Sequence, residues 1–534
     1  MEAQVSGGKA AIAALEAAGV EVVFGIPGVH TLALYDALHE SSIRHILARH
    51  EQGAGFMADG YARASGKPGV ALIITGPGIT NVATPVGEAY ADSSPVVIVS
   101  AQVERPYAGK MRGNLHDISD QTGLMSVVTK HSSQVTEHQH VASSVLGAVR
   151  EAVSGRPRPV HVEIPIDVMA ETGELVIPEV SAGYRPAPTR EQVEQATDLL
   201  LGARKPIIYV GGGALDASEP ITEIAALLGA PVLSSIMGKG VVADDHPYGL
   251  GHAWDAYSSE NPLDDLLHAA DLVLVVGTKL GAQETNYWQM PLPKQMIRVD
   301  IDPREIATNY PDPTLGIVAD AAATMDALLE SLRQRASEIS PRTSPEEVER
   351  YRSAVAPAED AYQPYIRALR SVIPRNGIIV QDMTMMSYRM NDAYPVYEPR
   401  TYLFPSNYGT LGFSVPAAIG AKIGAPEQAV VAIVGDGGFQ FTMQEVATAL
   451  QFDVTVPIVI FNDSTYTAVE QAMKSDTGRV MAVELKNPDY VKLAEAYGIP
   501  GVRANSADAL AQALETALGA TGPTIIDVPI PRME

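Results

Sequence analysis

The amino-acid sequence predicts an α/β protein with three doubly wound parallel-sheet domains, and two observations support this prediction. Short apolar runs of strand length alternate with helical segments along the whole chain. The chain has 534 residues, which is too long for a single hydrophobic core. Two stretches without apolar periodicity, near 171–190 and 336–358, interrupt the alternation. We therefore expect domains at 1–172, 188–335 and 357–534.

The individual elements follow from local signals. Ser6 can cap a helix that runs through Leu15 and closes at Gly19, and a buried strand Val20–Phe24 comes next. The same strand pattern recurs in each block, at Val70–Thr75, Val96–Val99, Pro206–Val210, Leu272–Val276, Ile297–Ile301, Ile378–Gln381, Val430–Val434 and Pro457–Phe461.

Composition argues against several function classes. A net charge of −25 disfavours nucleic-acid partners and anionic membranes, because both require clustered Lys and Arg. No apolar run approaches the roughly 20 residues that span a bilayer. The first residues lack the basic and apolar regions of a secretory signal, and the absence of cysteine removes disulfides and thiolate metal sites. We therefore expect a cytoplasmic protein.

The segment with the clearest chemistry follows the strand Val430–Val434. The strand ends in Gly435, Asp436, Gly437 and Gly438, and we expect a helix over Thr442–Leu450. Glycines let a phosphate approach the backbone, a helix start offers free N–H groups to an anion, and aspartate is a hard ligand for Mg²⁺. Taken alone, such a segment is more often a plain tight turn.

A second polar segment ends the next predicted strand, Pro457–Phe461. It carries Asp463, Thr465 and Tyr466. Neighbouring parallel strands bring their carboxyl ends together, where open α/β sheets bind ligands. Asp436 and Asp463 are therefore expected to hold one cation.

The pair, 27 residues apart, resembles the signature of thiamine-diphosphate-dependent enzymes. The resemblance implies that the first and third domains form the cofactor-binding fold. It also implies Mg²⁺ or another divalent cation on the Asp436 and Asp463 side chains and the Thr465 carbonyl. The diphosphate would be lined by Gly435, Gly437, Gly438 and Tyr466. The family usually has Asn at the position of Asp463, and the extra carboxylate adds negative charge there.

The segment from Arg49 to Arg63 resembles the part of acetolactate synthase-like enzymes that carries the cofactor-activating glutamate. From the residues alone, Glu51 would be a solvated acid near a helix start. The resemblance implies instead that Glu51 bonds the aminopyrimidine ring of the cofactor and manages its protons.

Further matches extend the resemblance over nearly the whole chain, to the acetolactate synthase, benzoylformate decarboxylase and pyruvate decarboxylase family. The segments 24–28, 75–81 and 88–93 look like this family. Tyr408–Phe413 is similar to the loop that bends the cofactor, with Leu411 as the wedge and the Gly409 carbonyl at the 4′-amino group; taken alone, Leu411 would be ordinary core. The implied cofactor contacts also include Gly28, Pro77, Asn81, Thr384 and Met385.

Substrate contacts are expected from two histidines and one helix. His30 is similar in position to an active-site histidine of benzaldehyde lyase, and His116 falls in a loop where relatives place a polar side chain. Either could instead be an ordinary structural histidine. Ala468 and Val469 occupy pocket-lining positions, whereas Glu470, one residue out of step with pyruvate decarboxylases, is expected to be an exposed helix carboxylate.

The resemblance implies a decarboxylase or carboligase that acts on a 2-oxo acid, with an aldehyde as a possible acceptor. A homodimer is its smallest working unit and a homotetramer is common. The central block lacks the Arg-Phe-Asp-Asp-type stretch that holds FAD in acetolactate synthases and has Gly277–Glu284 instead, which argues against FAD. Two alternatives remain open: an FAD-containing acetolactate synthase, and a non-catalytic paralogue that acts as a binding partner.

Overall fold

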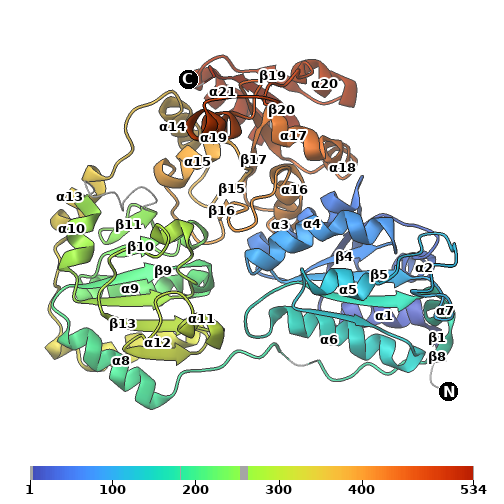
Figure 1. Ribbon diagram of the computed structural model, residues 1–534, viewed down its shortest axis with the longest axis horizontal. Coiled ribbons are helices and arrows are strands. Elements are labelled where there is room, and N and C mark those ends of the chain that lie inside the picture. Colours follow the sequence, from blue (N-terminus) through green and yellow to red (C-terminus); the bar gives the residue numbers. More distant parts are fainter. Residues whose placement is uncertain (1–3, 181, 253–261, 533–534) are drawn as a thin grey trace. The chain divides into compact units, whose positions relative to one another are not determined.

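The computed structural model describes residues 4–180, 182–252 and 262–532 and confirms the predicted class, with three parallel sheets covered by helices (Figure 1). The chain forms two compact units. One comprises Met1–Tyr184, Ile378–Met385 and Pro405–Glu534, and the other comprises Arg185–Gly377 and Met386–Phe404.

The N-terminal sheet is a six-stranded parallel sheet in which each neighbour pair runs in the same direction. Its strands, in spatial order, are β3 (Arg44–Leu47), β2 (Val22–Gly25), β4 (Gly69–Ile73), β5 (Val96–Gln102), β7 (Val160–Pro165) and β6 (His131–Gln134). Helices cover both faces (Figure 1), and the helices of this part are α1 (Gly7–Ala17), α2 (Leu32–His39), α3 (Glu51–Ser65), α4 (Pro77–Ala91), α5 (Gln121–Ser126), α6 (Val141–Val153) and α7 (Ile166–Ala170).

Local sequence signals explain these elements. The Ser6 hydroxyl accepts a hydrogen bond from the Lys9 N–H and caps α1, as expected, while Gly19 takes a left-handed conformation after it (φ +76°). The strands β2, β4 and β5 are buried throughout, as strands covered on both faces must be. A short antiparallel ribbon joins β1 (Gln4–Ser6) to β8 (Thr172–Glu174).

The C-terminal sheet has a parallel portion in the order β15 (Ile378–Gln381), β17 (Val430–Gly435), β18 (Pro457–Asn462), β20 (Thr524–Pro529) and β19 (Gly501–Arg503). Gly435 lies opposite Phe461, so the ends of β17 and β18 are adjacent. The helices of this part are α16 (Ser414–Gly424), α17 (Asp436–Thr442), α18 (Val446–Gln451), α19 (Thr467–Thr477), α20 (Tyr490–Tyr497) and α21 (Ala507–Leu518).

The helix expected over Thr442–Leu450 differs in the structure. Helix α17 begins directly at Asp436, one 3₁₀ turn covers Met443–Glu445, and α18 follows. Gly437 and Gly438 therefore lie inside the first turn of a helix. They are small because other residues pack against them, as described below.

Helices α3 and α16 pack through glycine. A β-carbon at Gly60 would lie 2.0 Å from the Ala417 carbonyl oxygen, and one at Gly420 would lie 1.9 Å from the Met57 carbonyl oxygen. No side chain fits between the two backbones at these points. The N-terminal and C-terminal sheets are thus joined by direct contact of two helix backbones.

The central domain has its own six-stranded parallel sheet, in the order β11 (Gly249–His252), β10 (Val232–Ser234), β9 (Pro206–Val210), β12 (Leu272–Val276), β13 (Gln295–Asp300) and β14 (Leu315–Val318). Its helices include α8 (Arg190–Gly202), α9 (Ser218–Leu228), α10 (Pro262–Ala269), α11 (Pro303–Ala307), α12 (Ala321–Gln334), α13 (Pro345–Ala354), α14 (Gln363–Val372) and most of α15 (Met385–Ala393). Helix α13 falls within the stretch 336–358 that lacked apolar periodicity, yet its Val348 and Tyr351 join the core of this domain.

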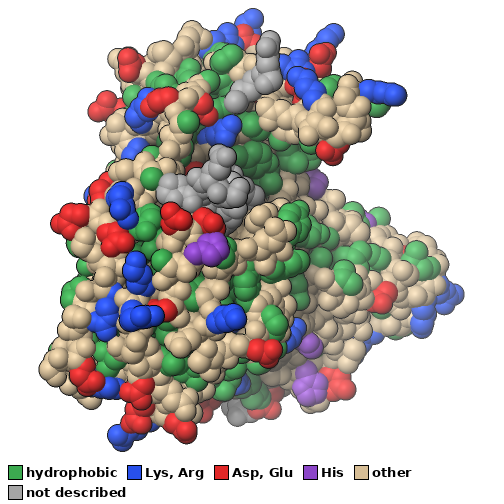
Figure 2. All heavy atoms as spheres, turned by 60° about the vertical axis from the view of Figure 1, so that its left-hand side comes forward, with side chains coloured by type: hydrophobic (Ala, Val, Ile, Leu, Met, Phe, Trp, Pro, Cys, Tyr) green, Lys and Arg blue, Asp and Glu red, His purple; other side chains and the backbone are tan. Residues whose placement is uncertain are grey.

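The surface carries both signs of charge. On the face in Figure 2, Asp and Glu side chains are interspersed with Lys and Arg, and the basic side chains drawn there do not merge into one patch. A bilayer crossing needs a long apolar helix, and none of the helices in the described parts of the chain has that character.

Candidate active site

Glu51 is the first residue of α3, and its carboxylate is half-buried. The preceding residue, His50, caps the helix by accepting the Gln52 N–H at Nδ1. From the start of α4, the Asn81 side-chain amide donates to Glu51 Oε2 over 2.9 Å. The structure therefore joins two of the predicted cofactor residues and fixes the direction of the glutamate.

A residue that the sequence did not reveal anchors the chain just before Glu51. The buried Glu445 carboxylate accepts the backbone N–H groups of Arg49 (3.1 Å) and His50 (3.0 Å), and also the Thr448 hydroxyl (2.7 Å). Burial raises the pKa of Glu445 to about 7. A β-carbon at Gly53 would lie 2.2 Å from Glu445 Oε1, so the first turn of α3 needs glycine there.

Gly28 and Pro77 lie at loop ends of the N-terminal domain. Gly28 exchanges hydrogen bonds with the Thr31 hydroxyl, and a β-carbon there would lie 2.3 Å from the Ile74 side chain. Pro77 is the exposed first residue of α4.

Asp436 and Asp463 lie at the adjacent ends of β17 and β18. Asp436 Oδ2 accepts a hydrogen bond from Asn487 (2.5 Å), while Asp463 accepts the Thr465 N–H (3.1 Å) and the Thr467 hydroxyl. Burial, opposed by the Asn487 hydrogen bond and reinforced by the charge of Asp463, raises the pKa of Asp436 to about 6. A divalent cation would favour the ionised form of such a carboxyl group.

The donor set suits Mg²⁺ bound together with a diphosphate. Two carboxylates and a nearby backbone carbonyl are hard oxygen ligands, and Mg²⁺ completes its shell with phosphate oxygens and water. Within the described residues, no group of three or more His, Cys, Asp or Glu forms a cage made of side chains alone. A site that shares its cation with a phosphate-bearing cofactor therefore fits these residues.

The glycines beside Asp436 make room for neighbouring side chains. A β-carbon at Gly437 would lie 2.5 Å from the Tyr466 ring, one at Gly438 would lie 2.9 Å from Asp382 Oδ1, and one at Gly435 would lie 2.9 Å from Thr384 Oγ1. The structure thus brings Thr384, Gly435, Gly437, Gly438 and Tyr466 together around the start of α17.

Asp382, which the sequence did not single out, ties the Thr384 turn to the loop at 408–413. It is fully buried and accepts the N–H groups of Met383 (2.9 Å), Gly412 (3.1 Å) and Ser414 (3.0 Å). Gly409 and Gly412 both adopt left-handed backbone (φ +75° and +82°). Leu411 lies between them, half-buried. The Met385 segment, Gly409 and Leu411 are therefore held in one region.

His30 and His116 stack with ring centroids 5.1 Å apart. Burial, together with the charge of His116, lowers the pKa of His30. Nδ1 of each ring, and both carboxylate oxygens of Asp117, are buried without a hydrogen-bond partner in the described chain. Asp117 was not singled out by the sequence.

Helix α19 presents Ala468 and Val469 to solvent, and Val469 is 48% exposed. The expectation that Glu470 is exposed is wrong. Its side chain is 5% exposed, because Arg532 (2.8 Å) and Lys474 (3.1 Å) bind its two oxygens. Glu470 is therefore paired within its own domain.

The predicted residues fall into two groups within one chain. Glu51, Asn81, His30 and His116 lie around the N-terminal sheet, and the Asp436 and Asp463 group lies at the C-terminal sheet, both within the same compact unit. No hydrogen bond or ion pair between the two groups exists among the residues that the structure describes.

Comparison with known proteins agrees with this division. Three family models of thiamine pyrophosphate (TPP) enzymes match the chain in order. They are the N-terminal TPP binding domain at 5–124, the central domain at 193–328 and the C-terminal TPP binding domain at 382–528. Thiamine pyrophosphate is another name for thiamine diphosphate.

Similar proteins cover almost the whole chain. A probable 2-ketoarginine decarboxylase from Pseudomonas aeruginosa is 39% identical over 98% of this chain and 94% of its own length. A probable acetolactate synthase large subunit from Methanocaldococcus jannaschii is 34% identical over 98% and 92%. The acetolactate synthase isozyme 3 large subunit from Escherichia coli is 34% identical over 96% and 92%. The chain therefore belongs to the thiamine pyrophosphate enzyme family.

Proposed function

We propose that the protein is a thiamine-diphosphate- and Mg²⁺-dependent 2-oxo acid decarboxylase or carboligase whose working unit is at least a homodimer. The observation that carries the proposal is the Glu51–Asn81 pair at the start of α3, in a chain that matches the family in all three domains. A homotetramer and a cytoplasmic location stay predictions.

Bound thiamine diphosphate supplies a carbon nucleophile and an electron sink for cleaving or forming the bond beside a 2-oxo acid carbonyl. Glu51 would hold a proton at the pyrimidine ring, aimed by Asn81. Asp436, Asp463 and the Thr465 carbonyl would hold the cation, and Gly435, Gly437, Gly438, Thr384, Met385 and Tyr466 would line the diphosphate. Gly28, Pro77, Gly409 and Leu411 would position the rings.

The substrate would lie near the stacked histidines, with Ala468 and Val469 facing its carbon chain. The lowered pKa of His30 favours a neutral ring, which can donate or accept a hydrogen bond at a carbonyl. The unpaired carboxylate of Asp117 favours a 2-oxo acid with a cationic side chain, because a buried carboxylate is costly without a positive partner. The name of the Pseudomonas relative supports the same substrate class.

CO₂ release from a panel of 2-oxo acids tests the proposal. The panel contains 2-ketoarginine, pyruvate and benzoylformate, and the proteins are wild type and Glu51→Gln. We expect turnover of at least one acid, fastest for 2-ketoarginine, and a loss of about 100-fold or more in kcat for Glu51→Gln, the scale of a positioned acid or base.

Glu219→Gln is the matched control, because Glu219 is an exposed glutamate in the first turn of α9, in the central domain. It should retain wild-type rates. Equal and negligible rates for wild type and Glu51→Gln across the panel would instead favour a non-catalytic binding partner.

Acetolactate formation is the second candidate, favoured by the named synthases among the relatives. It predicts a yellow, FAD-containing protein that converts pyruvate to acetolactate. A colourless protein that is inactive with pyruvate but active with another acid would rule it out.

A further inference from the structure

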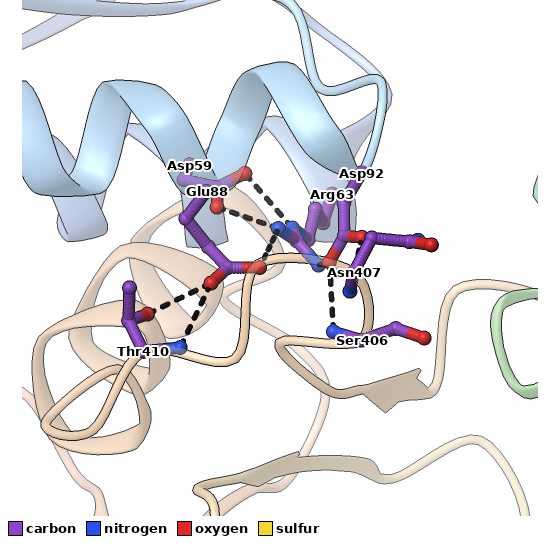
Figure 3. Close-up of polar contacts among 7 residues, drawn as sticks. All are labelled: Asp59, Arg63, Glu88, Asp92, Ser406, Asn407 and Thr410. Carbon is purple, nitrogen blue, oxygen red and sulfur yellow. Dashed lines mark hydrogen bonds and ion pairs between the residues drawn. The ribbon is translucent and has the colours of Figure 1, made fainter. Parts of the chain in front are cut away.

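A buried cluster of charged residues lies where α3 and α4 meet the loop that leads to Leu411 (Figure 3). Arg63 of α3 is surrounded by three carboxyl groups, those of Asp59, Glu88 and Asp92. The Arg63 side chain is 6% exposed and the three acids are 0% exposed. One buried guanidinium cannot neutralise three buried carboxylates.

Two of the three acids, Asp59 and Asp92, accept enough hydrogen bonds from N–H donors to be stable as ionised carboxylates. Asp59 binds Arg63 in a bidentate pair, with both distances 2.8 Å. Asp92 receives Arg63 (3.0 Å), the N–H groups of Ser406 and Asn407 (3.0 Å each) and the Asn407 amide (2.7 Å). Both acids are therefore satisfied as carboxylates.

Glu88 has fewer donors. It lies 4.0 Å from Arg63, and its Oε2 accepts the Thr410 N–H (3.1 Å) and hydroxyl (2.8 Å). Its Oε1 accepts no hydrogen bond from the described residues. Burial and the adjacent Asp92 raise the pKa of Glu88 to about 9. Glu88 is therefore the acid of this cluster that keeps its proton at neutral pH.

The cluster holds both ends of the segment 406–410. Asp92 binds its beginning, at Ser406 and Asn407, and Glu88 binds its end, at Thr410. Between them, a β-carbon at Gly87 would lie 2.8 Å from the Tyr408 ring, so the loop lies directly on α4. Thr410 separates Gly409 from Leu411 in the chain.

We propose that Glu88, in its protonated form, is a positioning residue that sets the Gly409 carbonyl and the Leu411 side chain for the cofactor by holding Thr410. This inference rests on the proposed assignment of that loop to the cofactor. The cluster has a net charge of −1 with Glu88 neutral and −2 when Glu88 ionises. Ionisation would strengthen the hydrogen bonds that Glu88 accepts from Thr410, but it would also place two buried charges, on Glu88 and Asp92, beside each other. Because Asp92 holds the start of the segment 406–410 and Glu88 holds its end, this repulsion would push the two ends apart and loosen the loop.

An affinity-versus-pH experiment tests the inference. The apparent dissociation constant for thiamine diphosphate is measured at saturating Mg²⁺ from pH 6.5 to 9.5 for wild type, Glu88→Gln and Glu88→Ala. Glutamine mimics the neutral acid, so Glu88→Gln should match wild type at pH 7. Wild type should lose affinity as the pH approaches 9, whereas Glu88→Gln should not. Glu88→Ala should bind about five- to tenfold more weakly at pH 7, since a buried acceptor is lost.

Unfolding measurements give an independent readout. The folded protein keeps a proton on Glu88 that the unfolded chain releases near its ordinary pKa of 4.5. Wild type should therefore lose stability relative to Glu88→Gln as the pH rises from about 4.5 to about 9. If Glu88→Ala does not fold, the comparison of wild type with Glu88→Gln decides.

Two further variants separate the possible failures. Val145→Ala removes core volume on α6, away from the loop, and should lower stability without changing the pH dependence of cofactor binding. Leu411→Ala should weaken cofactor binding; if it does not, the assignment of the loop fails. If Leu411→Ala weakens binding while wild type and Glu88→Gln share one pH profile, the role of Glu88 is refuted.

Discussion

Asp463 is the position at which the predicted metal site departs from its family. The Asp463 carboxylate accepts the Thr465 N–H and the Thr467 hydroxyl, so it also fixes the turn into α19. An asparagine at this position would accept the Thr465 N–H at its amide oxygen and donate its NH₂ group to the Thr467 hydroxyl, so it would keep the turn. The second carboxylate therefore adds mainly negative charge, which strengthens attraction for a cation.

Replacing Asp463 separates its charge from its ligand oxygen. Asp463→Asn keeps an oxygen and should reach near-normal kcat, but with a higher Mg²⁺ requirement. Asp463→Ala loses the oxygen as well and should raise the Mg²⁺ concentration for half-maximal activity further, by about tenfold or more, equivalent to about 1.4 kcal/mol. Titration of activity with Mg²⁺ measures both.

Asp476→Asn, on an exposed part of α19, makes the same charge change away from the site. Its Mg²⁺ titration should match wild type. Unchanged titrations for both Asp463 variants would exclude Asp463 as a ligand.

The sequence identified Glu51 and Asp436 through the motifs around them, but it could not identify Glu88, Asp382 or Glu445. Each of these acids acts on backbone N–H groups that are distant in the chain; Glu88 is 322 residues from Thr410, and Glu445 is 396 residues from Arg49. No local pattern records which buried N–H a carboxylate will meet. Only the packing of α3, α4 and α16 brings these partners together.

At the scale of elements, the start of α3 depends on Glu445. Glu445→Gln keeps the size of the side chain, but its NH₂ group faces the backbone N–H of Arg49 in either orientation, because that N–H lies 3.1 Å from both oxygens of Glu445. We expect a loss of about 1–3 kcal/mol in unfolding free energy, as for a buried donor left unpaired. We also expect a lower kcat, because Glu51 follows directly. Denaturant unfolding and steady-state rates measure the two effects.

Glu495→Gln is a suitable control, since Glu495 is an exposed glutamate on α20. It should change neither quantity. If Glu445→Gln were destabilised with an unaltered kcat, Glu445 would support the fold without positioning Glu51.

Strands were easier to predict than helix starts. β9, β12 and β15 begin and end at the predicted residues, because a buried parallel strand is a continuous apolar run between polar residues. Helix α17 was placed too late, because glycines disfavour a helix interior and only their contacts with Tyr466 and Asp382 explain them. Helix α13 was missed because only Val348 and Tyr351 of its ten residues are buried.

At the scale of the molecule, we propose that each site of the dimer combines Glu51 of one chain with Asp436 of the other. Mixed dimers test this. A Glu51→Gln subunit paired with an Asp436→Asn subunit would contain one doubly altered site and one intact site. Random pairing of these inactive parents should restore about a quarter of wild-type activity, because half of the dimers are mixed and each has one good site of two.

The experiment requires co-expressed subunits with different tags, so that the mixed species can be purified. The purified mixed dimer should show about half of wild-type activity per dimer. A mixed dimer as inactive as its parents would place both acids of each site in a single chain.

The strand orders of the two outer sheets carry one more consequence. Five neighbouring strands lie in the order β2-β4-β5-β7-β6 in the N-terminal sheet and β15-β17-β18-β20-β19 in the C-terminal sheet. In both, the first three strands follow chain order and the last two are exchanged, whereas the strands of the central sheet have a different order. Helix α3 precedes β4 in the chain, and α16 precedes β17, so the two helices hold equivalent positions in the two sheets. These are the helices that touch at Gly60 and Gly420. One polypeptide thus contains two sheets of the same strand order joined back to back through glycine, and the proposed dimer would contain four of them.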